Sequence, residues 1–418
     1  MRDTITAWFV LCAHYNRPVP RLLNISRREF CVGAGAMLAA GVARPGAGAD
    51  SAYALVAATD RRRILRAADE YLPLPIETIT AVPAPNSPGG PHDFVSQADY
   101  FWPDPKNPDG PYVNRDGQSN PANFNGHRRV MIALSVRMPA LTAAWRLTGD
   151  RRYARRATDY LTAWFADPAT RMNPNLEFAQ GVHGVSTGRS WGIIDTLHLV
   201  EVARAATFLD GPAHPLRSRD GIPGWFGEYL TWMKTSAKGR QERAAKNNHA
   251  TCWALQAAEF AQYVGDEGTR DELRTWYRAA LLPDQVGADG SFPQELTRTK
   301  PYSYSIFNFD VMAALAQSLD TPPRGGAERM CTFALPDGRG LCRAAAFLYP
   351  YLRDKAAWPY AKDVEHFEAL PVRSPGLLFA GLACRRDDYI ALWKTLNPDP
   401  TDPEIIRNYP VRQPLLWV

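Results

Sequence analysis

The stretch KNNHATCWALQAAEFAQYV, residues 246–264, is the most informative part of the sequence about the fold. From residue 250 to residue 264 its apolar residues recur at three- and four-residue spacing, which predicts an amphipathic helix. The break that follows, Gly265-Asp266-Glu267-Gly268, carries the glycines that typically end a helix. We therefore expect one complete helix here, followed by a short connection.

The same periodicity occurs along most of the chain. It predicts further helices at residues 130–147, 153–165, 193–208, 225–237, 271–282 and 309–319, separated by short breaks such as Thr148-Gly149-Asp150. Clear alternating strands are scarce. Helices in tandem with short connections favour antiparallel pairs, arranged either as a solenoid or as a closed toroid. Because no fixed-period repeat is visible, we expect an all-α fold of the (α/α) toroid type.

Composition and charge limit the class of protein. The chain has 418 residues, of which 45% are apolar and 22% charged, so disorder, collagen and coiled coil are excluded as overall descriptions. The net charge is +5, but the first 49 residues hold six arginines against Asp3 and Glu29. The remaining 42 basic and 41 acidic residues leave a net charge of +1. A broad basic face for nucleic acid is therefore not expected.

One long segment interrupts the helical pattern. Residues 82–125 are rich in Pro, Gly, Asn and Asp and include Asp99-Tyr100-Phe101-Trp102-Pro103-Asp104-Pro105. A loop of this length in a compact domain is usually functional or disordered, and its aromatic residues argue against disorder. Tyr100 and Trp102 either form a platform on which sugar rings stack or pin the loop to the helices.

The N-terminal region has the order of an export signal. Ser26-Arg27-Arg28-Glu29-Phe30 precedes a short apolar run at 31–42 and the small residues Ala47-Gly48-Ala49. This arrangement resembles a twin-arginine signal, although a stray arginine pair before an Ala-rich helix gives the same residues. We expect residues 1–49 to be removed and residues 50–418 to form the catalytic domain in the periplasm or outside the cell. No later segment reaches the ~20 apolar residues of a spanning helix, so no membrane anchor is expected.

Export places the remaining cysteines, Cys252, Cys331, Cys342 and Cys384, in an oxidising compartment. Cys331 and Cys342 bracket a turn-rich loop, and they either form a disulfide or remain as two buried thiols. No Cys-x-x-Cys motif and no Cys/His cluster with zinc spacing occurs, so neither a metal nor another cofactor is expected.

Candidate site residues gather in two segments. Asn247, Asn248 and His249 stand at a helix start, where the helix dipole favours an anion such as a carboxylate. About fifty residues further on, Arg298 and Tyr304 supply a guanidinium and a phenol. Taken singly, these residues also fit plain structural roles: an N-cap for Asn248, a buried histidine for His249 and a core aromatic for Tyr304.

Together these segments resemble the alginate lyase family. The shared motifs are Asn-Asn-His-x-x-x-Trp at 247–253, Asp-Gly-Ser-x-Pro-x-Glu-Leu-x-Arg at 289–298 and Tyr-Ser-x-Phe-Asn at 304–308. The resemblance extends to residues 99–105 and to Gly-Arg-Ser-Trp-Gly-Ile-Ile-Asp at 188–195, and so covers most of residues 90–395. It implies a toroid that cleaves an acidic polysaccharide by β-elimination, with Asn248, His249, Arg298 and Tyr304 as catalytic residues.

The chemistry of β-elimination suggests a role for each of these residues. Asn248 and His249 would neutralise the uronate carboxylate, so that the C5 carbanion can delocalise. Tyr304 would take the C5 proton and return one to O4, with Arg298 lowering its pKa. With guluronate, whose proton lies on the opposite ring face, His249 becomes the expected base. Tyr302 is the rival of Tyr304, which the family motif favours.

The substrate class follows from the same resemblance. Serines flank Tyr304, where the best-known alginate lyases have histidines, and the loop resembles a branch that includes glucuronan lyases. We therefore expect a 1,4-linked polyuronate, with alginate or polymannuronate first and glucuronan second. Arg189 is assigned to a carboxylate, whereas Gln180 and His183 either line neighbouring subsites or simply cap the local structure. The full set of expected substrate-binding residues is Tyr100, Trp102, Gln180, His183, Arg189, Asn247, Trp253 and Tyr302.

Two other classes of function remain open at this point. A glycoside hydrolase on the same helical architecture would use two carboxylates, for which Asp99, Asp195, Glu295 and Asp310 are available. No pair among them stands out in the sequence. A non-catalytic polysaccharide-binding protein would keep the aromatic residues and arginines without using Tyr304.

Overall fold

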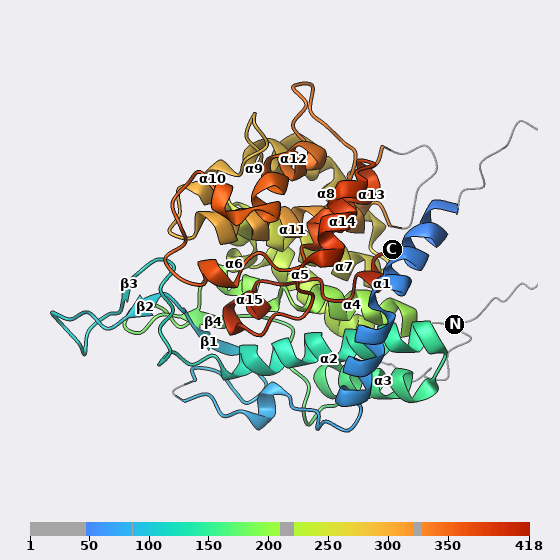
Figure 1. Cartoon of the computed structure of the whole chain (residues 1–418). Helices are drawn as coiled ribbons and strands as arrows, with labels where there is room; N and C mark the ends of the chain where they lie inside the picture. Colours follow the sequence, from blue (N-terminus) through green and yellow to red (C-terminus); the bar gives the residue numbers. More distant parts are fainter. Residues whose placement is uncertain (1–46, 86, 210–220, 322–327) are drawn as a thin grey trace, which may run out of the picture. The chain divides into compact units, whose positions relative to one another are not determined.

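Helices make up most of the computed structural model, which describes residues 47–85, 87–209, 221–321 and 328–418 (Figure 1). The α-helices are α1 (Ala47–Tyr71), α2 (Gly126–Thr148), α3 (Arg151–Phe165), α4 (Leu199–Leu209), α5 (Ile222–Thr235), α6 (Ala237–Arg243), α7 (Asn248–Val264), α8 (Glu267–Trp276), α9 (Leu282–Gln285), α10 (Pro293–Leu296), α11 (Pro301–Leu319), α12 (Leu341–Arg353), α13 (Pro375–Ala383), α14 (Asp387–Thr395) and α15 (Pro403–Arg407). Short 3-10 turns include η2 (Ser190–Thr196) and η6 (Pro414–Leu416).

The predicted helices are present, with shifted ends. Two of them are divided: 193–208 spans η2 and α4, and 271–282 spans α8, a π-helical turn at Tyr277–Leu281 and the start of α9. Local chemistry sets the boundaries. Gly149 ends α2 with a φ of 72°, and Asp150 caps α3 by accepting a hydrogen bond from the amide of Arg152 at 2.9 Å. Gly265 ends α7 in the same left-handed conformation.

Helices that follow one another in the sequence pack against each other, and several of them surround α7. Helix α2 contacts α1, α3 and α4, while α7 contacts α4, α5, α8 and α11. The core is a single apolar cluster that runs through all of these helices. This arrangement is the predicted (α/α) toroid.

Helix α1 was not expected from the sequence. From Ser51 onward, the buried positions of this helix are Ala52, Val56, Asp60, Ile64 and Ala68, which follow one another every four residues. Two of them are alanines and one is an acid, so the apolar signal is weak. Helices α12 to α15 were missed as well, because the break-rich region after residue 320 hides their short apolar stripes.

Helix α2 is long and apolar enough to cross a membrane by length and composition. The expectation that no segment after the signal reaches this limit was therefore wrong. Of its most apolar window, 61% is buried inside the fold, which is usual for a core helix.

Four short strands come from the predicted loop and from the segment after α3. Strands β1 (Val95–Gln97) and β4 (Phe178–Gly181) pair in parallel, and β2 (Phe101–Trp102) pairs antiparallel with β3 (Val113–Asn114). The β2 and β3 pair projects at the left of Figure 1. Asn120 and Asn123 hold the base of the loop by donating to the carbonyl oxygen of Phe101 at 2.9 and 3.0 Å. The loop is therefore an ordered platform beside the helices.

The disulfide joins Cys342 of α12 to Cys384 at the end of α13. Cys331 is a buried free thiol, so the bridge between Cys331 and Cys342 that the sequence left open does not form. The reason is tertiary: α12 begins at Leu341 and lies against α13, and Cys342 meets a cysteine 42 residues further on.

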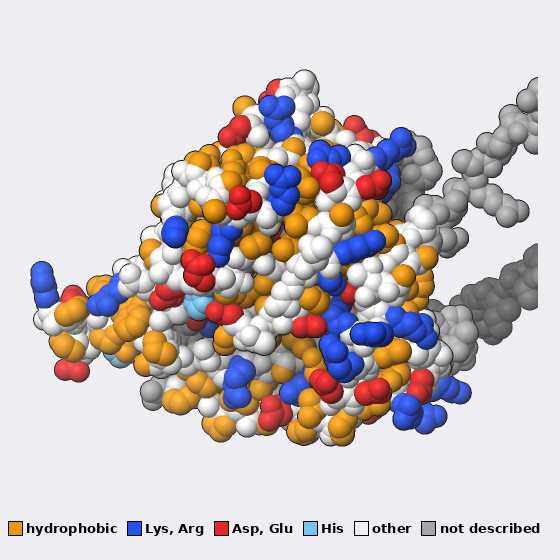
Figure 2. All heavy atoms as spheres, in the orientation of Figure 1, with side chains coloured by type: hydrophobic (Ala, Val, Ile, Leu, Met, Phe, Trp, Pro, Cys, Tyr) orange, Lys and Arg blue, Asp and Glu red, His pale blue; other side chains and the backbone are white. Residues whose placement is uncertain are grey.

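The C-terminal segment is part of the core. Val411, Leu415 and Trp417 are buried, and η6 packs against α1 and α2. The carboxylate of Glu201 accepts hydrogen bonds from the amides of Arg412 and Gln413 at 2.9 and 2.7 Å. On the face shown in Figure 2, basic and acidic side chains are interspersed, as the near-neutral charge after residue 49 predicts.

The proposed export signal lies almost wholly outside the described residues, which begin at Ala47 within the expected cleavage motif.

Candidate active site

A cavity of about 630 Å³ opens where the aromatic loop meets the starts of α7 and α11. All four residues predicted as catalytic line it, although they come from two separate segments of the chain. It is lined by Asp99, Tyr100, Phe101, Asn114, Asp116, Gln180, Arg189, Trp191, Ile194, Ala245, Lys246, Asn247, Asn248, His249, Gln294, Thr297, Arg298, Tyr304, Phe307, Arg407 and Asn408.

Asn248 is fixed by a buried carboxylate. Its backbone and side-chain nitrogens donate to the two oxygens of Glu295 at 2.7 and 2.8 Å. Burial raises the pKa of Glu295, although the bonds from Asn248 lower it. The N-cap of α7 is Asn247, whose side chain accepts from the amide of His249 at 3.3 Å. The side-chain amide of Asn248 therefore does not cap the helix and is held at the cavity wall.

His249 presents one ring nitrogen to the cavity. Its Nδ1 lies 2.5 Å from Oε1 of Glu242, and its ring lies 5.7 Å from that of Trp191. Because Nδ1 is engaged by Glu242, Nε2 is the nitrogen that remains for a substrate.

Arg298 is paired with an acid that the sequence did not single out. Its Nη2 and Nε donate to Asp116 at 2.6 and 3.2 Å, and its guanidinium lies 4.7 Å from the centre of the Tyr304 ring. Burial lowers the pKa of Arg298, but the bond and charge of Asp116, with other nearby groups, raise it overall. Arg298 is therefore a permanent cation beside Tyr304.

Tyr304 donates its hydroxyl proton to Tyr100 at 3.0 Å, and Tyr100 in turn donates to Glu404 at 3.4 Å. Burial raises the pKa of Tyr304 and outweighs the opposing effects of Tyr100 and Arg298. The expectation that Arg298 brings this pKa down toward working pH is therefore wrong for the structure described. Further stabilisation of the phenolate has to arise during catalysis.

Two aromatic residues assigned to substrate binding are in the core instead. Tyr302 is 0% exposed and donates its hydroxyl to the carbonyl of Tyr351 at 2.9 Å. Trp253 is 1% exposed, and its indole nitrogen donates to the carbonyl of Met233 at 3.3 Å. Both assignments were wrong, because these positions on α11 and α7 face neighbouring helices.

Two further assigned residues lie outside this cavity. Trp102 donates its indole proton to the carbonyl of Gln118 at 3.0 Å, and Arg115 lies over its ring, so it stabilises the loop. His183 is exposed and lines a second cavity of about 450 Å³ beside β1 and β4. The other assigned residues, Tyr100, Gln180, Arg189 and Asn247, do line the main cavity.

Arg189 differs from the other cations of the cavity. Arg298 pairs with Asp116, Arg407 with Asp99, and Lys246 with Asp284. In the described part of the chain Arg189 has no carboxylate partner. It donates to the carbonyl and side-chain oxygens of Gln180, both at 3.0 Å, and lies between the rings of Phe101 and Trp191. A half-buried guanidinium without an acid is suited to bind an anionic ligand.

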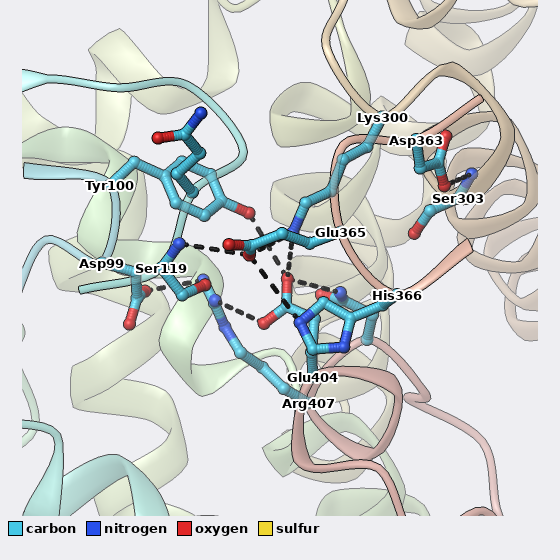
Figure 3. A network of polar contacts seen from close by, with 12 residues as sticks. Asp99, Tyr100, Ser119, Lys300, Ser303, Asp363, Glu365, His366, Glu404 and Arg407 are labelled. Atoms are coloured by element: carbon cyan, nitrogen blue, oxygen red, sulfur yellow. Dashed lines mark hydrogen bonds and ion pairs between the residues drawn. The ribbon is translucent and has the colours of Figure 1, made fainter. Parts of the chain in front are cut away.

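A network missed by sequence reasoning lies behind Tyr100 (Figure 3). Glu404 is 3.1 Å from Arg407 and 3.4 Å from Lys300. Burial raises the pKa of Glu404, but these two cations lower it to about 2. Arg407 also reaches Asp99 at 2.9 Å. Asp99 and Tyr100 lie in the motif at 99–105, but no motif marks Lys300, Glu404 or Arg407, which come close to them only in the folded chain.

The carboxylates considered for a hydrolase are all engaged elsewhere. Asp99 bonds Arg128 at 2.7 Å, Asp195 accepts from Ser96 at 2.6 Å, and Glu295 holds Asn248. Asp310 is buried on α11 away from the main cavity, where it accepts from Ser374 and from the amide of Gly376. Among these four acids no free pair flanks the cavity. In the ranges that the structure describes, no group of three or more His, Cys, Asp or Glu is placed to hold a metal ion.

An (α/α) toroid whose cavity combines amide, imidazole, guanidinium and phenol groups defines an enzyme class, the polysaccharide lyases. The sequence model described as "Alginate lyase" matches residues 78–358, and the chain belongs to this family.

Solved structures agree with this assignment. The crystal structure of an alginate lyase from Bacteroides ovatus is similar with a TM-score of 0.76 and 28% identity, over 88% of this chain and 98% of that chain. Alginate lyase A1-III, as a histidine-to-alanine variant complexed with a tetrasaccharide, has a TM-score of 0.51 and 17% identity, over 83% of this chain and 88% of that chain. This second likeness shows the fold alone. No curated protein sequence matches the chain.

Proposed function

We propose that the enzyme cleaves a 1,4-linked polyuronate by metal-independent β-elimination and leaves 4,5-unsaturated uronate ends. Alginate, in its mannuronate-rich form, is the first choice of substrate and glucuronan the second. The observation that carries the proposal is the single cavity in which Asn248, His249, Arg298 and Tyr304 meet the unpaired Arg189.

Neutralising the uronate carboxylate is the first requirement of the reaction. The C5 proton becomes acidic only when the carboxylate charge is balanced, because the carbanion then delocalises into it. Arg189 supplies a cation with no acid to displace, and His249 supplies Nε2. Asn248 has two side-chain amide protons, and the one that is not bonded to Glu295 can be donated to the carboxylate.

Proton transfer is assigned to Tyr304. As long as Glu404 is ionised it only accepts hydrogen bonds, so Tyr100 donates to Glu404 and Tyr304 donates to Tyr100. When Tyr304 loses its proton, Tyr100 can turn its hydroxyl to the phenolate, 3.0 Å away, and give up the longer bond to Glu404. Together with Arg298, this stabilises the base that removes the C5 proton. The phenol then returns a proton to the departing O4 on the same ring face.

Guluronate presents its C5 proton on the opposite face. For that substrate His249 is the proposed base, through Nε2, while Tyr304 protonates O4. This division of roles predicts that the loss of Tyr304 affects mannuronate and guluronate differently.

The family and the Bacteroides ovatus alginate lyase support alginate as the substrate. Glucuronan is the second choice because the loop resembles a branch that includes glucuronan lyases and because serines flank Tyr304. Neither Ser303 nor Ser305 lines the cavity, so these serines do not contact a sugar there. Position 303 faces the carboxylate of Asp363, which accepts from its amide at 2.9 Å.

The test is to incubate the purified protein with mannuronan, guluronan, glucuronan and hyaluronan and to follow the ultraviolet absorbance of the conjugated double bond. We expect the fastest rise with mannuronan, unchanged by a metal chelator. New reducing ends without this absorbance would show that the enzyme is a hydrolase and not a lyase. Binding without either product would indicate a polysaccharide-binding protein.

We further propose that the enzyme acts in the periplasm or outside the cell. The support is the order of Arg27-Arg28, the apolar run at 31–42 and Ala47-Gly48-Ala49 in the sequence.

A further inference from the structure

Glu242 is a buried acid whose second oxygen has no structural use. It lies near the end of α6, its side chain is 0% exposed, and Oε1 contacts Nδ1 of His249. Among the described residues Oε2 of Glu242 has no hydrogen-bond partner. Such a half-bonded carboxylate costs stability, because a buried charge normally needs every lone pair satisfied.

Three other buried glutamates differ in this respect. Glu295 bonds Asn248 through both oxygens, and Glu259 bonds Arg204 through both oxygens at 2.6 and 2.9 Å. Both oxygens of Glu201 accept from backbone amides. These three acids hold elements together through both oxygens, whereas Glu242 contacts the imidazole of His249 through one oxygen. A neutral glutamine would join α6 to α7 equally well.

We propose that Glu242 is a positioning residue for catalysis. It fixes His249 in the tautomer with the proton on Nδ1, keeps Nε2 at the cavity, and balances the imidazolium when Nε2 carries a proton. The proposal rests on the proposed lyase function for its kinetic consequences only. The tautomer itself is a property of the protein that can be measured without substrate.

Other ionisable groups also act on this pair. Arg189 before η2, Tyr229 of α5 and Cys252 of α7 lie within electrostatic reach of Glu242, and Glu295 of α10 lies within reach of His249. Glu295 is committed to Asn248, and Arg189 donates to Gln180. The proton on Nδ1 is thus governed by Glu242, the acid in direct contact with it.

The principal variant is Glu242→Gln, which keeps the shape and removes the charge. In proteases, an amide in place of the acid that orients a catalytic histidine costs about 10⁴-fold. Here Arg189 and Asn248 also neutralise the uronate carboxylate, so the loss should be smaller. We expect kcat on mannuronan to fall about 10²-fold with KM changed less than about threefold. Adding Glu242→Gln to His249→Ala should cause no further loss.

Glu259→Gln is the matched control. It makes the same chemical change at a buried glutamate of α7 that does not line the cavity. We expect a lower Tm with an unchanged kcat and pH profile. If Glu242→Gln behaves in this way, or if its effect multiplies that of His249→Ala, the positioning role is wrong.

Nitrogen NMR of histidine-labelled protein tests the tautomer without activity. We expect Nδ1 to be protonated in the wild type and the two tautomers to mix in Glu242→Gln. A wild-type neutral His249 with its proton on Nε2 would overturn the proposal even if Glu242→Gln does not fold. If the wild type shows no lyase activity but Nδ1 carries the proton, the proposed function fails and the tautomer assignment stands.

Discussion

Tyr302 and Tyr304 are two residues apart on one helix, and this spacing decides which of them reaches the substrate. Successive residues of an α-helix are turned by about 100°, so the two side chains point in nearly opposite directions. Tyr304 lines the cavity, and Tyr302 packs against Trp358 and Phe367 in the core. The structure thereby gives the two tyrosines different expected effects on mutation.

Tyr304→Phe removes one oxygen and keeps the ring. We expect activity on mannuronan to fall at least about 10⁴-fold, because one side chain performs two proton transfers that are each worth 10²- to 10⁴-fold. Stability should change by only about 1 kcal/mol, the usual contribution of one hydrogen bond. The measurement is kcat with polymer binding as a second readout. Tyr302→Phe is the control and should remain active; the reverse result would transfer the role to Tyr302.

Arg298→Lys keeps the charge but loses the planar fork that holds Asp116 through two bonds. We expect kcat/KM to fall about 10²-fold, or about 2.7 kcal/mol. A less closely placed cation stabilises the Tyr304 phenolate less, so the alkaline side of the activity profile should move to higher pH. Unaltered kinetics across the whole pH range would show that Arg298 pairs with Asp116 but takes no part in catalysis.

At the scale of elements, the disulfide connects α12 to α13 across 42 residues. Closing a loop of that length stabilises the fold by up to about 4 kcal/mol in the chain-entropy model. We therefore expect Cys342→Ser to lower the Tm by several degrees and a reductant to do the same to the wild type. Cys331→Ser removes only a buried free thiol and keeps the disulfide, so reductant should lower its Tm as in the wild type, whereas Cys342→Ser should be insensitive to reductant. Mass spectrometry that finds Cys331 in a disulfide would contradict the pairing.

Asp310 links α11 to α13 and gives this contact a pH dependence. Burial raises its pKa to about 7, although bonds from Ser374 and Gly376 lower it. Because the folded-state pKa is above that of the unfolded chain, its contribution is greatest below about pH 4 and is lost as the pH rises toward 7. Asp310→Asn should flatten this decline, which amounts to a few kcal/mol. Thermal unfolding at pH 5 and pH 8 checks it: equal losses of Tm at both values would exclude ionisation as the cause.

At the scale of the whole molecule, the proposed export signal would determine where the enzyme meets its substrate. Twin-arginine receptors read the arginine pair and pass folded proteins, so replacing Arg27 and Arg28 by lysine should leave the precursor in the cytoplasm. Fractionation followed by N-terminal sequencing of the exported protein is the measurement, and we expect residues 1–49 to be absent from it. Normal export of the double-lysine variant would refute this route.

Helices α2 to α5, α7, α8 and α11 followed from the sequence, because helical periodicity is a local property. The breaks at Gly149 and Gly265 were read correctly for the same reason, since a left-handed residue ends a helix whatever surrounds it. The motif at 247–253 likewise indicated the site, and there Asn248 and His249 do line the cavity. In the same motif, however, Trp253 faces the core, because motif membership does not say which way a side chain points.

The sequence by itself determined the helical fold class, the family and the segments that supply the cavity. Only the tertiary structure decided the partners: Asp116 on Arg298, 182 residues away, Glu242 on His249, and Cys384 on Cys342. It also decided that burial keeps the pKa of Tyr304 high despite Arg298. The physical reason is that periodicity and motifs encode what neighbours along the chain do. Ion pairs, disulfides and desolvation depend on which distant segments the packing of the toroid brings into contact.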